Sequence, residues 1–433
     1  MTASTAVPDE MLADSARPAN SRGAMLRAGW LGVGMLLVIT AYNTAQPYIT
    51  TLYPDHGFYS LALVYGVYIF TSIGAPYLTE TFSASSILFA AGAFHGLFIV
   101  GLLWGTASLF AFAALVGVGN GMLWICQGHY ITTCSTSFGV PIGRLSSALF
   151  TLLSLNMIIG NIAMAWLLEQ GVDISTMLYI LGGVAAVGSA LLLFLPKPYA
   201  ADSTPIVSAP LLSLPDQLRA MARVGLRRPL LDVVPLIAFH GSLFTFAFAN
   251  FPLFMPADRP KWLQPAAYLG FGVAGTILMP IWGRLFDHRG APPLVAGLLG
   301  IGILTYALSY WCILGGSSVP RFAWIAAMSS VGALDSVCMS LTNMSISSDF
   351  TSGPDVSVAF AVYRLVFGLG FISLALVSNL GLWQVVLGLG HVFLLTAVGA
   401  FVLRIRRGHG KVPRIEAEVL LEEDDKTVVQ RGD

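Results

Sequence analysis

The strongest constraint in this sequence is a series of long apolar segments that recurs along its whole length. The first set lies near 27–50, 57–79, 84–105, 109–133, 144–168 and 173–195, and the second near 230–254, 264–283, 291–314, 319–345, 357–379 and 382–405. A transmembrane helix needs roughly 20 apolar residues, because the hydrocarbon core is about 30 Å thick and a helix rises about 1.5 Å per residue. The pattern predicts an all-α polytopic membrane protein with twelve transmembrane helices in two six-helix bundles.

The composition agrees with this class and excludes others. Only 10% of the residues are charged and 56% are hydrophobic, whereas a soluble domain carries about 25% charged residues. So few charges cannot cover a water-facing surface, which excludes ordinary soluble enzymes, coiled coils and disordered chains. The formal net charge is zero, so no basic field is available for nucleic acid and no nucleic-acid partner is expected.

The distribution of Lys and Arg predicts how the chain is oriented in the membrane. With the N-terminus inside, sixteen cationic side chains fall on the cytoplasmic side and only Arg259, Lys261 and Arg321 on the outer side. We therefore predict two membrane bundles separated by a cytoplasmic linker and flanked by cytoplasmic tails. In chain order these five segments are 1–26, 27–195, 196–229, 230–405 and 406–433.

The linker contains apolar residues at helical spacing, with Arg219 and Arg223 on the opposite side. These apolar residues are Leu211, Leu214, Leu218 and Met221. The pattern indicates an amphipathic helix that lies on the membrane surface. A flexible basic linker is the alternative interpretation.

A short charged motif follows the eighth apolar segment, Gly283-Arg-Leu-Phe-Asp287-His-Arg289-Gly290. It resembles the loop pattern Gly-x-Leu-x-Asp-x-x-Gly of the major facilitator superfamily. The glycines would allow a tight turn, Asp287 would cap a neighbouring helix, and an arginine would pair with it. With the six-plus-six arrangement, this resemblance implies the major facilitator fold.

Segments in both halves resemble a narrower group, the uncoordinated-93-like (UNC-93-like) branch of that superfamily. The most specific is the run from Trp124 to Tyr130, Trp-Ile-Cys-Gln-Gly-His-Tyr. Other matching segments are 41–46, 60–66, 117–123, 160–161, 332–335 and 359–364. The branch includes regulatory subunits of potassium channels, trafficking chaperones for receptors, and transport proteins with no assigned substrate. The resemblance therefore implies the fold and leaves two functional classes open.

In this superfamily the first, fourth, seventh and tenth helices line a central cavity, so polar residues on those helices are candidates for contact with a solute. The candidates on the first and fourth apolar segments are Asn43, Gln46, Asn120, Trp124, Gln127 and Tyr130. Those on the fourth segment share one helical face, with Tyr130 at its edge. Solute binding and hydrogen-bonded packing between helices are the two interpretations of this face.

Asp335 is the one carboxylate placed deep in an apolar segment, where its charge costs about 2.5–3.5 kcal/mol. Counted from the cytoplasmic side, Asp335 and Arg364 lie about 15 and 12 Å deep. We predict that they form an intramembrane ion pair, which is either static or opens and closes during transport. His240 on the seventh segment is the histidine best placed for proton coupling, with ordinary packing as the alternative.

Glycines in the apolar segments predict close contacts between helices. They are Gly117, Gly121, Gly297, Gly300, Gly368 and Gly388. The sequence contains no GxxxxGK[ST], HExxH or GxSxG pattern and no metal-ligand spacing of its four cysteines. We therefore expect no enzyme activity, no cofactor and no metal site.

The acidic run that ends in Leu420 and Leu421 resembles a dileucine sorting signal. It suggests an endolysosomal or vacuolar membrane, with an ordinary solvated tail in the plasma membrane as the alternative. The leading functional hypothesis is an alternating-access secondary transporter of a small, neutral or amphipathic solute, because the candidate cavity residues carry few charges. The alternative is a non-transporting regulatory or trafficking subunit, such as an ion-channel regulator or receptor chaperone. The expected partners are the lipid bilayer, a small-molecule solute and, for the alternative, a second membrane protein.

Overall fold

A computed structural model describes residues 21–140, 142–199, 213–350 and 354–408. Among these residues the regular structure is entirely helical, and twelve helical segments are long and apolar enough to cross a membrane. In chain order the twelve spans are Ser21–Leu52, Gly57–Gly74, Ala84–Gly101, Thr106–Phe138, Arg144–Glu169, Ile174–Leu193, Arg228–Phe254, Leu263–Arg289, Pro292–Ser318, Arg321–Asp349, Val358–Ser378 and Trp383–Arg406. The predicted all-α architecture with twelve spans is confirmed.

Contacts between Cα atoms divide the chain into two compact units. The first comprises Met1–Gln217 with Pro260–Leu269, and the second comprises Leu218–Arg259 with Gly270–Asp433. The main division, after Gln217, falls inside the predicted linker at 196–229. Most of both predicted tails and the dileucine run at 420–421 lie outside the described residues.

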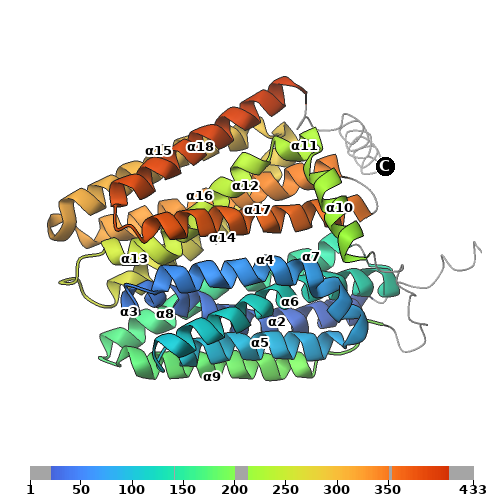
Figure 1. The fold of residues 1–433 in the computed structure, drawn as a ribbon, viewed down its shortest axis with the longest axis horizontal. Helices are drawn as coiled ribbons and strands as arrows, with labels where there is room; N and C mark the ends of the chain where they lie inside the picture. Colours follow the sequence, from blue (N-terminus) through green and yellow to red (C-terminus); the bar gives the residue numbers. More distant parts are fainter. Residues whose placement is uncertain (1–20, 141, 200–212, 351–353, 409–433) are drawn as a thin grey trace, which may run out of the picture. The chain divides into compact units, whose positions relative to one another are not determined.

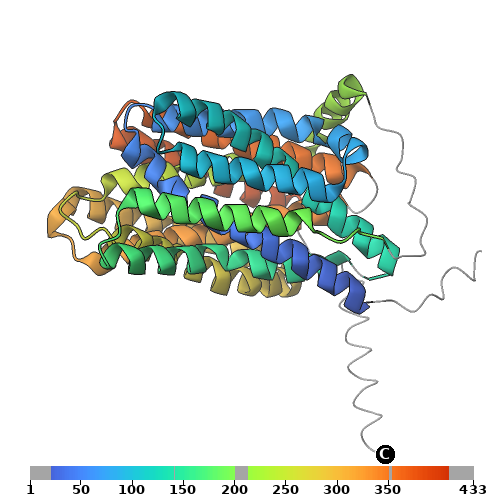
Figure 2. The same ribbon diagram turned by 90° about the horizontal axis from the view of Figure 1, so that it is seen from below.

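The first unit is built around its first span. This span consists of α2 (Ser21–Ala45), the 3-10 turn η2 (Gln46–Tyr48) and α3 (Ile49–Leu52). The other helices of the unit are α4 (Gly57–Thr81), α5 (Ala84–Gly101), α6 (Thr106–Phe138), α7 (Ile142–Ser154), α8 (Asn156–Glu169) and α9 (Ile174–Leu193). Helix α2 packs against α5, α6, α7, α8 and α9 (Figure 1), and Figure 2 shows the dark blue α2 running against the green α9.

Local sequence determines several helix ends in this unit. The side chains of Ser83 and Asp173 accept hydrogen bonds from the backbone N–H groups of Ser86 (3.3 Å) and Thr176 (3.0 Å), so they cap α5 and α9. The side-chain and backbone hydrogen bonds from Thr176 lower the pKa of the Asp173 carboxyl. Helix α6 ends at Gly139, whose φ of +62° is a left-handed conformation that favours glycine.

The seventh span of the chain lies at the centre of the second unit. It comprises α11 (Arg228–Leu231), α12 (Val234–Thr245), the π-helical turn η3 (Phe246–Asn250) and α13 (Phe251–Phe254). Two helices begin in the first unit and continue into the second, α10 (Leu214–Gly225) and α14 (Leu263–Arg289). The other elements of the second unit are α15 (Pro292–Gly315), η4 (Gly316–Ser318), α16 (Arg321–Asp349), α17 (Pro354–Ser378) and α18 (Trp383–Arg406). Helix α12 packs against α16, α17 and α18.

Glycines bring particular helix pairs into backbone contact. A Cβ atom added at Gly241 would lie 2.1 Å from the carbonyl oxygen of Phe367, and one added at Gly370 would lie 2.3 Å from that of Ala238. Helices α12 and α17 therefore touch through their backbones at both positions. Close contacts also occur at three of the predicted positions, Gly117, Gly121 and Gly297.

The packing prediction was wrong for Gly300 and Gly388. A Cβ atom added at either glycine would meet no atom within 4 Å. Both glycines lie on helix faces that point into open space, so their small size is not used for helix contact. Spacing along a helix does not reveal which face is covered, and this explains the error.

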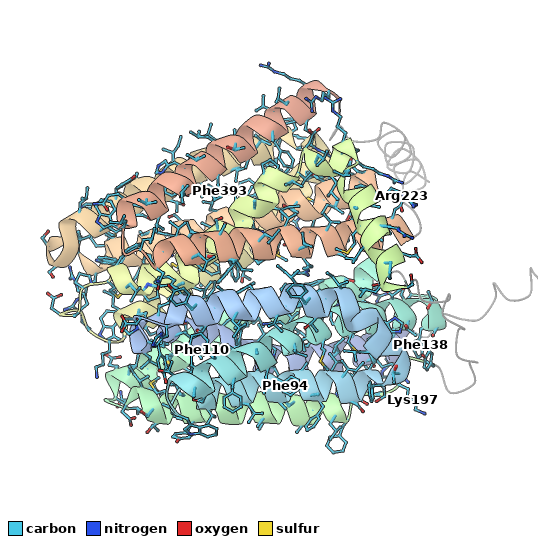
Figure 3. All side chains as sticks on the ribbon, in the orientation of Figure 1. Phe94, Phe110, Phe138, Lys197, Arg223 and Phe393 are labelled. Carbon is cyan, nitrogen blue, oxygen red and sulfur yellow. The ribbon has the colours of Figure 1, made fainter. Side chains whose placement is uncertain are left out.

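The spans expose large apolar side chains on their outer surfaces. Phe70, Ile162 and Val392 have exposed fractions of 76%, 52% and 58%. Figure 3 shows such side chains standing out from the helices along their whole length. Soluble monomers rarely carry contiguous apolar patches above a few hundred Å², so these surfaces fit a hydrocarbon environment.

The predicted amphipathic segment of the linker is helical from Leu214 to Gly225, while Leu211 lies outside the described residues. Leu214 and Leu218 are exposed, and Val224 is buried. Just after this helix, a guanidinium N–H of Arg227 donates to the Asp355 carboxylate of α17 at 2.6 Å. The end of the linker therefore contacts α17 through an exposed ion pair.

Candidate functional site

The first and seventh spans are interrupted at matching places. In the first span the 3-10 turn η2 is followed by the four residues of α3, and in the seventh the π turn η3 is followed by the four residues of α13. Each interruption is accompanied by a proline, Pro47 in η2 and Pro252 in α13. Proline removes a backbone N–H donor, and irregular backbone at membrane depth is tolerated where protein or a cavity surrounds it. These two places are candidate functional regions, one in each unit.

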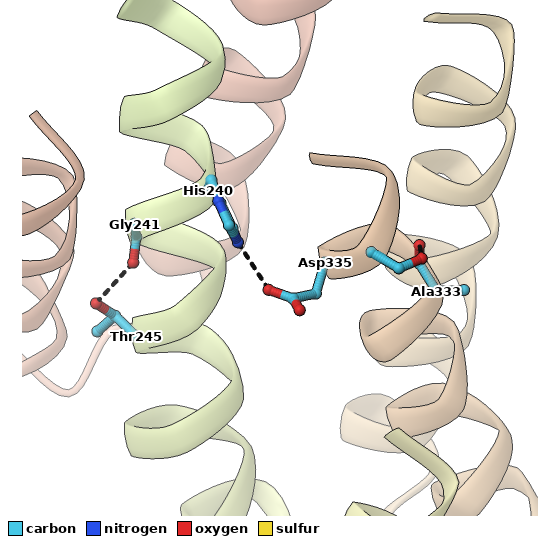
Figure 4. Close-up of polar contacts among 6 residues, drawn as sticks. His240, Gly241, Thr245, Ala333 and Asp335 are labelled. Atoms are coloured by element: carbon cyan, nitrogen blue, oxygen red, sulfur yellow. Dashed lines mark hydrogen bonds and ion pairs between the residues drawn. The ribbon is translucent and has the colours of Figure 1, made fainter. Parts of the chain in front are cut away.

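The polar centre of the second unit is a buried pair formed by His240 on α12 and Asp335 on α16. His240 Nε2 and Asp335 Oδ1 are 2.8 Å apart, and the two side chains are 4% and 14% exposed (Figure 4). An ionised carboxylate only accepts hydrogen bonds, so with Asp335 ionised His240 Nε2–H is the donor. The imidazole thus provides the partner that a carboxylate inside a membrane span requires.

Aromatic rings surround this pair. The ring centroids of Phe367 and Phe244 lie 5.0 and 6.2 Å from that of His240, both edge-on. His240 Nδ1 is buried and has no hydrogen-bond partner among the described residues. One polar pair with a spare ring nitrogen is therefore enclosed by apolar faces.

The structure places His240 beside Asp335, and the predicted pair of Asp335 with Arg364 stays a prediction. The Arg364 guanidinium lies over the ring of Tyr363, 5.2 Å from its centroid. Asp335 lies 14 residues before the end of α16 and Arg364 10 residues after the start of α17, so their depths are about 21 and 15 Å. His240, 12 residues after Arg228, is about 18 Å deep and closer in level to Asp335. The helix ends of the structure thus set Arg364 about 6 Å from the level of Asp335, compared with about 3 Å from the predicted span ends.

The candidates in the first unit are used largely for contacts between helices. Asn43 Nδ2 donates to Asn156 Oδ1 of α8 at 2.9 Å, and Asn120 Oδ1 lies 3.3 Å from His95 Nε2 of α5. The hydroxyl of Tyr130 donates to the carbonyl oxygen of Pro196 at 2.7 Å. These contacts favour the packing interpretation for the three residues.

The remaining candidates of this unit have different surroundings. Gln46 and Gln127 are buried, with exposed fractions of 1% and 6%. Trp124 is half-buried and packs against the hydrophobic core of the unit. All the first-unit candidates therefore lie in one helical bundle, but Asn43, Asn120 and Tyr130 each hydrogen-bond to a different residue.

Sequence reasoning missed two polar residues that the structure uses. His95 on α5 is fully buried, and its Nδ1 lies 2.7 Å from the carbonyl oxygen of Ala91. Asn156 had not been considered. Each contacts an amide that had been a candidate, so a search for polar residues on neighbouring spans at matching depth could have found them.

The charged motif after the eighth span is helical for most of its length. Gly283, Asp287 and Arg289 all belong to α14, which continues to Arg289, so the tight loop predicted over this motif is wrong. The turn is concentrated at Gly290, whose φ is +72° and whose N–H donates to the carbonyl oxygen of Phe286 at 2.7 Å. Gly290 therefore has the role expected of it, whereas Gly283 lies within a helix and Asp287 is exposed near its end.

The fold is similar to that of solved transporter structures. It resembles the crystal structure of the nucleoside transporter NupG with a TM-score of 0.62 and 14% identity, over 87% of this chain and 99% of that chain. The D323A mutant of NupG gives a TM-score of 0.63 and 16% identity, over 88% and 99%. The chain has the fold of a major facilitator superfamily transporter, as the sequence predicted.

Sequence comparison then defines the family. The family described as "Ion channel regulatory protein UNC-93" matches residues 49–342, and the chain belongs to this family. UNC93-like protein MFSD11 of Xenopus tropicalis is 24% identical over 65% of this chain and 70% of its own length. UNC93-like protein 3 of Arabidopsis thaliana is 28% identical over 51% of each chain, so this match spans about half of the relative. The predicted resemblance is confirmed.

Proposed function

We propose that this protein is a secondary transporter that moves a small, neutral or amphipathic solute by alternating access. The observation that carries the proposal is the buried pair of His240 and Asp335 at 2.8 Å on two spans. An ionisable residue inside a membrane span is costly and by default indicates a functional site. The transporter fold supports the same conclusion.

The geometry of the pair suggests what it does for a solute. Its depth of about 18–21 Å from the nearer helix ends lies close to the midplane of a hydrocarbon core about 30 Å thick, where transporters of this kind bind their substrates. A solute hydroxyl or amide would bind Asp335 Oδ1 or His240 Nε2 in place of the internal hydrogen bond. The rings of Phe244 and Phe367 would contact the apolar part of the same solute.

A thermal-shift screen of the purified full-length protein tests this proposal. The library contains nucleosides, sugars, amino acids and small amphipathic molecules at matched concentrations. A bound solute at a hundredfold excess over its Kd stabilises the folded state by about 2.7 kcal/mol. We expect one chemical class to raise the melting temperature and Asp335→Asn to abolish that response. The matched control Asp173→Asn changes an exposed helix cap and should retain it.

The alternative function is a regulatory subunit of another membrane protein. The description of the family, "Ion channel regulatory protein UNC-93", favours it. A regulator requires no solute response, and it should copurify with a larger membrane partner in stoichiometric amount. Failure of the whole library, together with such copurification, would overturn the transporter proposal.

A further inference from the structure

A groove opens on the outer surface of the first unit, at the end of α2 that begins with Ser21. Its volume is about 490 Å³, and it is lined by α2 from Arg22 to Val33, by Leu152 of α7 and by Leu191 of α9. All lining side chains except that of Arg22 are apolar. The exposed residues Leu26, Trp30 and Val33 show that the groove faces outward from the bundle.

Three glycines of α2 explain where the groove opens and where it ends. A Cβ atom added at Gly32 would lie 2.7 Å from Leu152 Cδ1, and one added at Gly34 would lie 2.7 Å from Leu192 Cδ2. At these positions α7 and α9 pack tightly on α2. A Cβ atom added at Gly29 would meet nothing within 4 Å. The helices therefore separate on this side of α2, and Gly29 leaves the space between them open.

The walls of the groove are fixed by hydrogen bonds. The indole N–H of Trp30 donates to the carbonyl oxygen of Leu191 at 2.8 Å, which fastens the ring between α2 and α9. Arg27 is used in contacts within the protein. Its Nε–H donates to the carbonyl oxygen of Lys197 at 2.9 Å, and its guanidinium lies over the ring of Phe138. Phe138 and Lys197 are at the same end of the unit (Figure 3). Arg22 is the cationic side chain that lines the groove.

The dimensions of the groove match one leaflet of a bilayer. Arg22 and Val33 are 11 residues apart on one helix, which is about 16 Å, and half of the hydrocarbon core is about 15 Å. The cation lies at the end of the span, where lipid headgroups lie, and the apolar walls continue toward the membrane centre. A guanidinium binds phosphate oxygens by paired charge-assisted hydrogen bonds, and apolar walls suit an acyl chain.

We propose that this groove binds one anionic phospholipid. The phosphate contacts Arg22, and an acyl chain runs along α2 past Gly29 and the ring of Trp30. With the N-terminus on the cytoplasmic side, as the Lys and Arg distribution predicts, the lipid belongs to the inner leaflet. The site is separate from the buried pair of the second unit and does not depend on the proposed transport function.

Native mass spectrometry of the full-length protein tests the proposal with dioleoyl phosphatidylglycerol and dioleoyl phosphatidylcholine, which share acyl chains and differ in headgroup charge. We expect one phosphatidylglycerol molecule to be retained in preference to phosphatidylcholine. Arg22→Gln should lower the affinity for phosphatidylglycerol at least about tenfold, because the paired charge-assisted hydrogen bonds to the phosphate are lost, and should remove the preference. Gly29→Leu fills the groove without a backbone clash and should abolish retention of both lipids.

Two matched variants provide the controls. Arg144→Gln removes an exposed arginine elsewhere in the same unit, and Gly183→Leu adds the same side chain at an open position on α9. Both should retain phosphatidylglycerol as the wild type does. The proposal would be overturned if Gly29→Leu retained the lipid, if Arg144→Gln lowered its affinity as much as Arg22→Gln, or if the wild type bound both lipids equally.

Discussion

At the scale of single residues, the pair of His240 and Asp335 makes each side chain dependent on the other. Removal of one partner from a buried pair leaves the other without compensation and costs about 3–5 kcal/mol. We expect His240→Leu to lower the free energy of unfolding by an amount in this range. The double variant His240→Leu with Asp335→Leu should be more stable than His240→Leu alone, because two apolar residues need no partner. Unfolding of the protein in mixed detergent micelles measures both.

Asp335→Leu alone completes a double-mutant cycle with these two variants, and its coupling energy also reports the charge of the pair. A neutral hydrogen bond between transmembrane helices contributes about 0.6 kcal/mol on average. A coupling energy of about 2 kcal/mol or more would indicate that the pair is ionised. Additive effects of the two substitutions would show that the 2.8 Å contact has no energetic role.

A second prediction contrasts a buried with an exposed arginine in the same unit. Arg404 is fully buried, where it pairs with Asp349 and donates to the carbonyl oxygen of Pro229 at 2.8 Å. We expect Arg404→Met to destabilise the protein by about 3–5 kcal/mol, because Asp349 is left buried and unpaired. Arg227→Met breaks a pair whose side chains are 46% and 41% exposed and should cost about 1 kcal/mol or less. Equal shifts in melting temperature for the two variants would contradict this prediction.

The sequence predicts the candidate polar residues better than it predicts which of them contact one another. Both members of the central pair were candidates because an ionisable group is rare within an apolar segment, and that signal is independent of the neighbours. The partner depends on depth and on helix rotation, and an error of four residues in a span end shifts the depth by about 6 Å. A shift of this size equals the difference in depth between Asp335 and Arg364. The rotation of α5 and α6, which the sequence does not define, determines the contact of Asn120 with His95.

At the scale of helices, contact between α12 and α17 depends on glycine. The Cβ atom of an alanine at position 241 would lie 2.1 Å from a backbone oxygen of the neighbouring helix, and backbone cannot yield as a flexible side chain does. We expect Gly241→Ala to separate the helices and to lower the melting temperature or prevent folding. Gly388→Ala places the same methyl group in open space on α18 and should be neutral or stabilising by up to about 1 kcal/mol. Similar melting temperatures for the two variants would contradict the packing described here.

The sequence predicts where the twelve spans lie, but it does not predict the 3-10 and π turns that interrupt two of them. Span length follows from membrane thickness, so the twelve apolar segments could be recognised without knowledge of their packing. The π turn at Phe246–Asn250 has a weaker signal, because four of its five residues are as apolar as their neighbours and Pro252 two residues later does not specify the type of turn. The motif that ends at Gly290 was also misjudged, since its charges favour a loop while its backbone continues α14.

At the scale of the whole molecule, the predicted orientation can be tested with cysteine substitutions. The four native cysteines are buried, with exposed fractions of 0–1%, so a membrane-impermeant maleimide should label the wild type weakly. We expect Ser318→Cys, at an exposed turn after α15, to be labelled in intact cells. Arg144→Cys should be labelled only after the membrane is permeabilised. The reverse pattern would place both termini outside the cell and assign the groove beside Arg22 to the outer leaflet.

The two interrupted spans also affect how the two halves of the chain should be aligned in a search for an ancestral gene duplication. A 3-10 turn takes fewer residues than an α-helical turn and a π turn takes more, so the first and seventh spans deviate in opposite directions. In an ungapped alignment of the two halves, the first and seventh spans therefore lose register at the turns Gln46–Tyr48 and Phe246–Asn250, close to the ends of both spans. Evidence for an ancestral gene duplication in this chain should accordingly be sought with an alignment that permits an inserted position in the seventh span.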